Sequence, residues 1–253
     1  MEPGQGAWHI AVLIPARNEE KLLSRCLQSV ERARLELPFG VTTDVIVVAD
    51  SCTDRTYDIA CERLSNKGTV ARSMAGNVGT ARALASSLAL NRSQNVSRYC
   101  WFANTDADCE VPKNWLLQQL EFARQGIEAV AGRVSVDTFA EHLPHVAQRF
   151  QETYTVFSDG SHPHVHGANL GIRADVYQAI GGWQDLATAE DHQLWNRLVE
   201  HGRLCRSVAS LSVVTSGRRV GRAPLGFAGA LAAHNAISEG YEKPLNVATT
   251  FVS

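Results

Sequence analysis

The segment Ile10–Glu19, with the sequence IAVLIPARNE, starts as an apolar run, is stopped by Pro15 and ends in polar residues. A short apolar run bounded in this way is typical of a strand that is buried on both faces. Apolar residues then recur at helical spacing up to Val30, and Asn18 is placed to act as the N-cap of that helix. The segment therefore predicts a strand, a polar loop and a helix, the first unit of an α/β fold.

The same alternation continues through most of the chain. Further short apolar runs predict strands, and stretches with helical periodicity lie between them. Strands are expected at 45–49, 69–72, 99–103 and 129–136, and helices at 54–64, 80–90, 112–125 and 140–157. This order predicts an α/β fold with a mostly parallel sheet and helices on both faces. In such sheets ligands bind beyond the carboxyl ends of the strands.

We expect one domain, residues 1–253, with a core at about 8–222 and a C-terminal helix and tail at 223–253. No linker rich in Pro, Gly or Ser divides the chain. The stretch Leu225–Ala236 predicts a small amphipathic helix, and core packing is favoured over membrane docking because it lacks a strong basic face. The tail after about Asn235 has little pattern, so we expect part of it to be disordered.

Composition narrows the class of protein. Hydrophobic residues make up 45% of the chain, which excludes a disordered chain, and the net charge of −2 argues against a nucleic-acid partner. The apolar runs are far shorter than the roughly 20 residues that cross a bilayer, and no secretory signal pattern opens the sequence. The six cysteines contain no C-x-x-C pair, which argues against structural zinc. We therefore expect a cytoplasmic protein with reduced thiols and no membrane span.

Acidic residues follow three of the expected strands. Glu19 lies after the first strand, Asp50 ends the second, and Asp106 and Asp108 form a D-x-D motif after the strand at 99–103. Because these loops meet at one edge of the sheet, their carboxylates are expected to converge and to repel each other unless a cation or hydrogen-bond donors offset the charge. Hard oxygen ligands select Mg²⁺ or Mn²⁺, which commonly bind substrate phosphates as well. The pattern favours a nucleotide-diphosphate site.

Each of these motifs has a structural interpretation when it is taken alone. Two aspartates in a loop are frequent turn formers, and Ser51 with Asp54 matches a capping box. The order of the motifs after successive strands, rather than any single motif, favours the ligand site.

A second group of polar residues, Glu190-Asp191-His192, opens a helix that ends near Gly202. Thr188 as the N-cap and Asp191 at position N3 would form a capping box. Alternatively, the helix dipole keeps an aspartate in the first turn ionised, so that Asp191 can accept a proton from an alcohol.

Together, these residues resemble the family 2 glycosyltransferases of GT-A fold over roughly residues 8–222. Two segments depart from the family's patterns: Ala49 and Cys52 differ from V-D-D-G-S-T-D-G-T, and Arg82 differs from N-x-G-x-A-x-A. The segments that carry the resemblance are Ile14–Glu19, Val48–Thr56, Gly76–Arg82, Thr105–Asp108, Gly167–Arg173, Gly181–Trp183, Glu190–Asp191 and Thr215–Arg219.

The resemblance implies a single GT-A-type, Rossmann-like domain and a hexosyltransferase-like enzyme. Such an enzyme moves a sugar from a UDP-, GDP- or dTDP-sugar to the hydroxyl of a small-molecule or lipid-linked acceptor, with inversion as the family expectation. The resemblance assigns the general base to Asp191 and a divalent ion, Mn²⁺ or Mg²⁺, to Asp108 with Asp106. The nucleotide-sugar-binding residues it implies are Pro15, Arg17, Glu19, Asp50, Asn77, Asp106, Arg218 and Arg219, and the acceptor-binding residues are His166, Asn169, Trp183 and Glu190.

Three features have alternative interpretations. His162, His164 and His166 would share one face of an extended segment and could bind a transition metal, although a polar loop is favoured. Trp183 could stack on an acceptor sugar or pack in the core. The stretch Arg218–Arg222 could contact the diphosphate or form a surface patch.

The sequence leaves two alternatives to a glycosyltransferase. A sugar-phosphate nucleotidyltransferase binds nucleoside phosphates on a related sheet, but its usual first loop is rich in glycine and differs from Pro15–Glu19. A non-catalytic nucleotide-sugar-binding protein of the same fold is disfavoured by the intact D-x-D motif and the Glu190-Asp191 pair.

Overall fold

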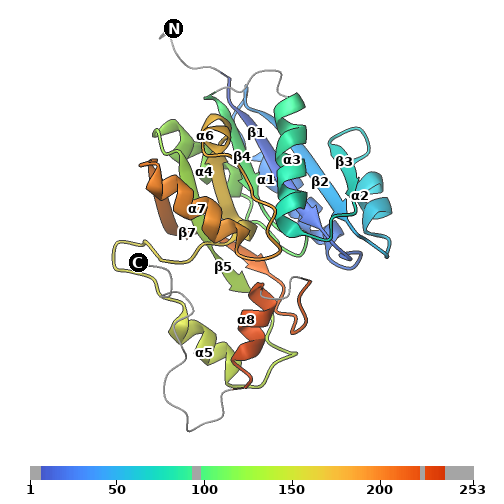
Figure 1. Ribbon diagram of the computed structural model, residues 1–253, viewed down its shortest axis with the longest axis vertical. Helices are drawn as coiled ribbons and strands as arrows, with labels where there is room; N and C mark the ends of the chain where they lie inside the picture. Colours follow the sequence, from blue (N-terminus) through green and yellow to red (C-terminus); the bar gives the residue numbers. More distant parts are fainter. Residues whose placement is uncertain (1–6, 93–97, 223–225, 237–253) are drawn as a thin grey trace.

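The computed structural model describes residues 7–92, 98–222 and 226–236, and its centre is a seven-stranded sheet (Figure 1). The strand order is β3-β2-β1-β4-β6-β5-β7. All neighbouring strands are parallel except that β6 runs antiparallel to both β4 and β5. The expected α/β class and mostly parallel sheet are therefore confirmed. The strands are β1 (His9–Ala16), β2 (Thr42–Asp50), β3 (Thr69–Ser73), β4 (Cys100–Asn104), β5 (Ala129–Val136), β6 (Leu170–Arg173) and β7 (Cys205–Thr215).

Strand β1 shows why the sheet is central. Its side chains alternate between two hydrophobic clusters: Ile10, Val12 and Ile14 face one, and Ala11 and Leu13 face the other. All five residues are fully buried, because β1 lies between β2 and β4 and is covered on both faces. The continuous apolar run in the sequence is the direct consequence of this double burial.

Helices cover both faces of the sheet, as expected. The face that includes Ile10 is covered by α1 (Leu23–Leu35), α2 (Thr56–Leu64) and α4 (Trp115–Arg124). The opposite face is covered by α3 (Val78–Arg92), α6 (Ala174–Ala179) and α7 (Glu190–Glu200). These helices cover the faces of the sheet, and the loops that follow β1, β2 and β4 lie at its carboxyl edge.

Two further helices, α5 (Val146–Thr153) and α8 (Phe227–Ala233), lie together beyond the end of β5 (Figure 1). Their rings meet where Phe150 and Phe227 make an edge-to-face contact with centroids 5.8 Å apart. The helix expected at 140–157 is wrong in its limits, because Pro144 removes an N–H group and disfavours helical backbone before it. Helix α8 falls inside the expected 225–236, whereas the tail beyond 236 lies outside the described residues.

Three expected helix starts are also wrong, and α4 begins at Trp115 instead of residue 112. Helix α1 begins at Leu23, not next to Asn18, which has a left-handed φ of 54° and uses its Oδ1 to accept a hydrogen bond from the Thr53 N–H at 2.8 Å. Asn18 therefore joins the loops after β1 and β2 instead of capping a helix. Helix α2 begins at Thr56, whose N–H donates to Asp54 Oδ1 at 2.9 Å.

Proline 15 does not stop the first strand, contrary to expectation, and β1 continues to Ala16. Pairing with β4 ends at Leu13, so Pro15 lies where the strand is paired with β2 alone. A residue without an N–H group is tolerated at such a position.

Strands β6 and β7 were not expected from the sequence. Strand β6 is only 4 residues long and follows a one-turn 3₁₀ helix, so it has too little alternation to be noticed. Strand β7 lies at the edge of the sheet next to β5, and polar residues interrupt its apolar ones. Both segments form strands because they pair with neighbouring strands of the sheet, and not because of a pattern in their own sequence.

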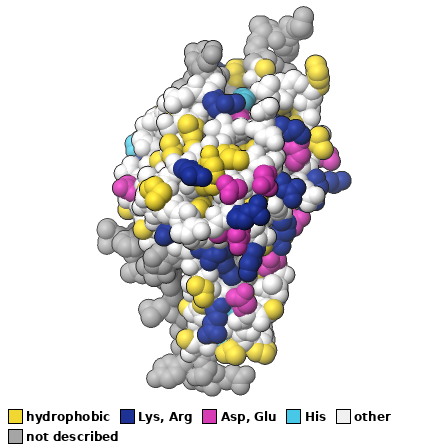
Figure 2. Space-filling view, turned by 90° about the vertical axis from the view of Figure 1, so that its right-hand side faces the viewer, with side chains coloured by type: hydrophobic (Ala, Val, Ile, Leu, Met, Phe, Trp, Pro, Cys, Tyr) yellow, Lys and Arg dark blue, Asp and Glu magenta, His cyan; other side chains and the backbone are white. Residues whose placement is uncertain are grey.

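Figure 2 shows one face of the molecule with basic and acidic side chains next to one another over its middle. This mixture differs from the continuous basic stripe that binds a nucleic-acid backbone. Within the described ranges, the helices are all too short or too polar to cross a bilayer.

Candidate active site

The acidic loops converge at the carboxyl edge of the sheet, as expected. Glu19 follows β1, Asp106 and Asp108 follow β4, and Glu190 and Asp191 open α7. Ion pairs and hydrogen bonds connect these loops to two arginines, one on α3 and one after β7. The site is therefore built from segments that lie far apart in the sequence.

Arg82, on α3, is the central cation of this cluster. Its side chain is 2% exposed; Nη2 donates to Asp106 Oδ1 at 2.6 Å and Nε donates to Glu190 Oε1 at 3.1 Å. Burial alone would lower the pKa of Arg82, but Asp106, Glu190 and Asp191 outweigh it and hold the pKa above its usual range. Arg82 thus stays charged and connects the D-x-D motif to the start of α7.

From the sequence, Arg82 was expected only as a departure from a family motif, and its pairing with Asp106 and Glu190 was missed. A signal existed, because Arg82 shares a helix face with Ala85, Ser86 and Ala89, all of which are buried. A charged residue on the small-residue face of a helix has to be paired when that face packs against a sheet.

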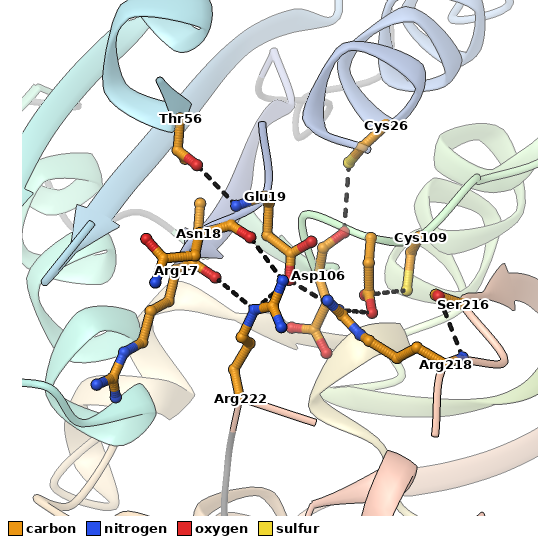
Figure 3. A network of polar contacts seen from close by, with 12 residues as sticks. Arg17, Asn18, Glu19, Cys26, Thr56, Asp106, Cys109, Ser216, Arg218 and Arg222 are labelled. Atoms are coloured by element: carbon orange, nitrogen blue, oxygen red, sulfur yellow. Dashed lines mark hydrogen bonds and ion pairs between the residues drawn. The ribbon is translucent and has the colours of Figure 1, made fainter. Parts of the chain in front are cut away.

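Arg218 supplies the second cation. It lies after β7, and its Nη2 atom donates to Glu19 Oε1 at 2.7 Å and also to Asp108 Oδ2 (Figure 3). Arg222 reaches the same region, where its Nη2 donates to the Asn18 carbonyl at 2.8 Å. Burial raises the pKa of Glu19, although the bond from Arg218 opposes this shift. Arg219 is exposed, and its backbone N–H donates to Glu141, so only Arg218 of the adjacent pair contacts the carboxylates.

Asp50 and Asn77 form a separate group at the end of β2. The carboxylate of Asp50 is buried and accepts hydrogen bonds from the backbone N–H groups of Gly76 at 3.1 Å and Asn77 at 2.9 Å. Asn77 in turn donates to Asp185 at 2.7 Å. Arg17 donates to the Gly76 carbonyl at 3.1 Å, so the loops after β1, β2 and β3 are held together.

A hollow of about 150 Å³ lies next to this group. It is a mixed polar and apolar depression near the ends of β2 and β3, where the Arg72 guanidinium lies 3.8 Å from the centre of the Tyr57 ring. Its lining comprises Ala49, Cys52, Asp54, Tyr57, Asp58, Arg72, Ser73 and Met74. A larger hollow between α1 and α2, of about 180 Å³, contains none of the expected site residues.

Asp191 lies in the first turn of α7 without forming the expected capping box. Position 189, an alanine with a φ of 59°, precedes the helix, and Thr188 makes no capping bond. The carboxylate of Asp191 instead accepts a hydrogen bond from the backbone N–H of Gly167 at 2.8 Å. This contact fixes Asp191 beside the segment that contains His166.

Glu190 and Asp191 have different environments. Glu190 is buried, and burial raises its pKa, with Arg82 opposing the shift. Asp191 is only half-buried and is held by N–H donors rather than by a bonded cation. Of the two, Asp191 is therefore the carboxylate that is better placed to take a proton from a substrate.

Besides Glu190, two of the expected acceptor-binding residues, Asn169 and Trp183, are buried. Asn169 is fully buried; its amide accepts from the Trp115 indole at 2.9 Å and donates to the carbonyls of Arg133 and Leu211, both at 2.9 Å. Trp183 is 6% exposed and packs in the hydrophobic cluster beneath α7. These positions favour the packing alternative over contact with an acceptor for both residues.

The three histidines line up as the spacing predicted. The rings of His162 and His164 lie 6.0 Å apart, and those of His164 and His166 lie 6.1 Å apart, each pair nearly parallel. Parallel rings do not direct their nitrogens to one point. Among the described residues, the ligand atoms that converge belong to Asp106, Asp108 and Cys109, not to these histidines.

The D-x-D carboxylates fit a divalent cation. The ligand atoms of Asp106, Asp108 and Cys109 lie within 4.8 Å of one another. The two carboxylates provide the hard oxygen atoms that Mg²⁺ and Mn²⁺ prefer. Each carboxylate is also bonded to an arginine, so a cation bound here shares its ligands with Arg82 and Arg218.

The fold and the acidic site at its carboxyl edge define a GT-A-like α/β protein, and the chain belongs to glycosyl transferase family 2. The sequence profile of that family matches residues 11–181, more than half of the chain. A curated relative, "Probable glycosyltransferase YdaM" of Bacillus subtilis (strain 168), is 28% identical over 210 residues, which cover 76% of this chain and 47% of the relative. The chain thus spans about half the length of that relative.

Solved structures support the GT-A-like fold. TarS of S. aureus aligns with a TM-score of 0.60 and 19% identity over 82% of this chain and 36% of TarS. TarS 1-349 in complex with UDP-GlcNAc aligns with a TM-score of 0.61 and 18% identity over 86% of this chain and 61% of that protein. At these identities the similarity concerns the fold.

We expect Asn169→Ala to destabilise the protein by about 3 kcal/mol, because the Trp115 indole N–H and two carbonyls lose their buried partner. Urea unfolding of the variant measures the loss. Asn114→Ala is the matched control, since Asn114 is exposed and its side chain makes no capping bond. Equal stability of the two variants would contradict the structural role of Asn169.

We expect Arg82→Met to cost about 3 kcal/mol near neutral pH, because Glu190 and Asp106 then lose their cation. Burial already raises the pKa of both carboxyls, and loss of Arg82 raises it further. Protonation removes the unpaired charge, so the deficit is present at about pH 7 and shrinks as the pH falls to about 5.

The measurement is urea unfolding at both pH values. Arg55→Met is the control, because Arg55 pairs with Glu62 and both side chains are exposed, at 67% and 65%. An exposed pair contributes at most about 1 kcal/mol. A deficit in Arg82→Met that grows at the lower pH would contradict the assignment of Arg82 as the partner of buried carboxylates.

Proposed function

We propose that the protein transfers a sugar from a nucleotide-diphosphate sugar to an acceptor hydroxyl, with Asp191 as general base. The observation that carries the proposal is the convergence of Asp106 and Asp191 around Arg82, with Asp108 next to Asp106, at the carboxyl edge of the sheet. Membership of glycosyl transferase family 2 supports the reaction class. The two alternatives, a sugar-phosphate nucleotidyltransferase and a non-catalytic binding protein, receive no support from the family.

The proposed donor is a UDP-sugar. GDP-sugars and dTDP-sugars are the alternative donors. TarS 1-349 has been crystallised with UDP-GlcNAc and with UDP, and it has the same fold. Asp50, Asn77 and the hollow next to them are proposed to hold the nucleoside end of the donor. Arg17 bonds to the Gly76 carbonyl near that hollow, and Arg218 bonds to Glu19 and to Asp108 of the D-x-D motif. These contacts support Arg17, Glu19 and Arg218, with Arg219 next in the chain, as the proposed binding site for the diphosphate.

The metal is proposed to be Mn²⁺ or Mg²⁺, held by Asp108 and Asp106. Such an ion would act as a Lewis acid on the leaving diphosphate. Arg218 contributes charge-assisted hydrogen bonds to phosphate oxygens once it leaves Asp108. Glu19 and Asp108, which Arg218 bonds to at present, keep its guanidinium within reach of that position.

Asp191 is proposed to accept the proton of the acceptor hydroxyl. The acceptor oxygen then forms a bond with the anomeric carbon of the donor sugar, while the bond from that carbon to the diphosphate breaks and the diphosphate leaves with the electron pair. Attack from the side opposite the leaving group inverts the anomeric carbon. The Gly167 N–H holds the carboxylate in place before the reaction.

The acceptor is proposed to be a small or lipid-linked hydroxyl compound in the cytoplasm. His166 and Glu190 lie on either side of Asp191 and are the expected acceptor-side residues that remain close to the base. A single transfer, rather than polymer synthesis, is proposed for the described part of the chain.

We expect Asp191→Asn to lower kcat by roughly 10²-fold or more, because the amide cannot accept the proton. Donor binding should survive, since Asp191 contacts no donor-side residue by a hydrogen bond. Turnover of the donor with an acceptor panel and calorimetry with UDP and Mn²⁺ measure the two effects. Glu200→Gln at the exposed end of α7 is the control. Near-normal kcat in Asp191→Asn would reject the base.

We expect Asp108→Ala to remove the metal-dependent part of donor binding. A ligand that binds only the folded state raises the melting temperature by mass action. A thermal-shift screen with UDP-, GDP- and dTDP-sugars and Mn²⁺ therefore identifies the donor base in the wild type and should show a smaller shift in the variant. Asp159→Ala, in an exposed loop, controls for loss of a carboxylate. An unchanged shift in Asp108→Ala would reject its role at the metal.

A further inference from the structure

The hydroxyl of Tyr154 lies at the end of α5 and makes two hydrogen bonds. The backbone N–H of Val134 donates to the hydroxyl oxygen at 3.0 Å, and the hydroxyl lies 3.0 Å from His166 Nε2. A phenol has a single proton to donate. Val134 can only donate, so the hydroxyl proton of Tyr154 remains free for donation to Nε2 of His166.

This arrangement favours one tautomer of His166. When the Tyr154 hydroxyl donates to Nε2, the neutral imidazole carries its proton on Nδ1. Burial lowers the pKa of His166 to about 4, with the charge of Asp191 opposing the shift, so the ring is neutral near pH 7. Burial also raises the pKa of Tyr154 to about 12, so the hydroxyl keeps its proton.

The ring of His166 is held on three sides by other rings. It is nearly parallel to His164, with centroids 6.1 Å apart, and to Tyr154 at 6.0 Å, and it meets Phe227 edge to face at 5.8 Å. Its Nδ1 atom has no hydrogen-bond partner among the described residues. The next residue, Gly167, binds Asp191 through its N–H, so a free imidazole donor lies beside the proposed base.

We propose that Tyr154 positions His166 in its Nδ1–H tautomer, and that Nδ1–H donates a hydrogen bond to a hydroxyl oxygen of an uncharged sugar acceptor. This inference rests on the proposed function, which it extends to the acceptor. A neutral imidazole offers a directed hydrogen bond without charge, and aromatic rings around it suit the apolar face of a sugar ring. An anionic headgroup would require a cation at this position.

The tautomer is measured directly by ¹⁵N NMR of the full chain labelled at histidine, without any substrate. The His166 signals are assigned by their loss in His166→Asn. We expect the Nδ1–H form in the wild type and a change toward Nε2–H in Tyr154→Phe, which lacks the hydroxyl donor. A wild-type His166 that is protonated on Nε2 would overturn the positioning role of Tyr154.

The acceptor contact is tested with the same labelled protein and a set of p-nitrophenyl glycosides, in the presence of UDP and Mn²⁺. We expect at least one glycoside to shift the His166 Nδ1 signal, whereas p-nitrophenyl phosphate leaves it unchanged. An Nδ1 signal that no glycoside shifts, or that the phosphate alone shifts, overturns the sugar acceptor.

Conservative variants separate this role from a general effect on folding. Asn at position 166 retains a donor near Nδ1, whereas Gln places its amide near Nε2. We therefore expect His166→Asn to bind the responding glycoside nearly as tightly as the wild type and His166→Gln to bind it roughly 10-fold more weakly, as loss of one hydrogen bond implies. His192→Asn, exposed beside Asp191, is the control.

Equal binding by the Asn and Gln variants would overturn the donor role of Nδ1. Failure of the proposed function would show itself separately, as absence of UDP binding or of transfer in a protein whose His166 tautomer is as stated.

Discussion

Repulsion between carboxylates at the carboxyl edge of the sheet is the constraint on which the site depends. Glu19, Asp106, Asp108 and Glu190 are brought together by strand ends and by the start of α7. Such a cluster is stable only if cations offset it. Arg82 and Arg218 do so, and each bridges two carboxylates from different loops. Removing either guanidinium would leave a partly desolvated negative charge without a partner.

The same ion pairs explain how segments that are distant in the sequence are held in place relative to one another. Arg82 joins α3 to the loop after β4 and to α7, while Arg218 joins the segment after β7 to the loops after β1 and β4. A divalent cation that binds Asp106 and Asp108 has to compete with these guanidiniums, so its apparent affinity is lower than that of an unpaired carboxylate cluster. An arginine that the cation displaces is already next to the site proposed for the diphosphate.

The sequence was informative where burial imposes a pattern. The runs in β1, β2 and β4 are apolar because both faces of the sheet are covered, and the D-x-D motif follows β4 as expected. It was less informative where a tertiary contact overrides a local preference. Asn18 and Asp191 are residue types that commonly cap the N-terminus of a helix. Their side chains instead accept hydrogen bonds from the backbone N–H groups of Thr53 and Gly167. Arg82 was missed because its partners lie 24 and 108 residues away.

The histidine row shows how far spacing alone can determine chemistry. Period-two spacing correctly predicted that His162, His164 and His166 share one face, because side chains alternate along an extended segment. It could not give the angle between the rings, which decides whether the nitrogens meet. Tyr154 comes from α5, and its ring stacks 4.0 Å from His164, so the rings are packed parallel rather than directed to one ion. The histidine spacing resembles a metal site. Because residues at the end of α5 and in α8 pack against these histidines, the rings instead form a row of stacked aromatic side chains near Asp191.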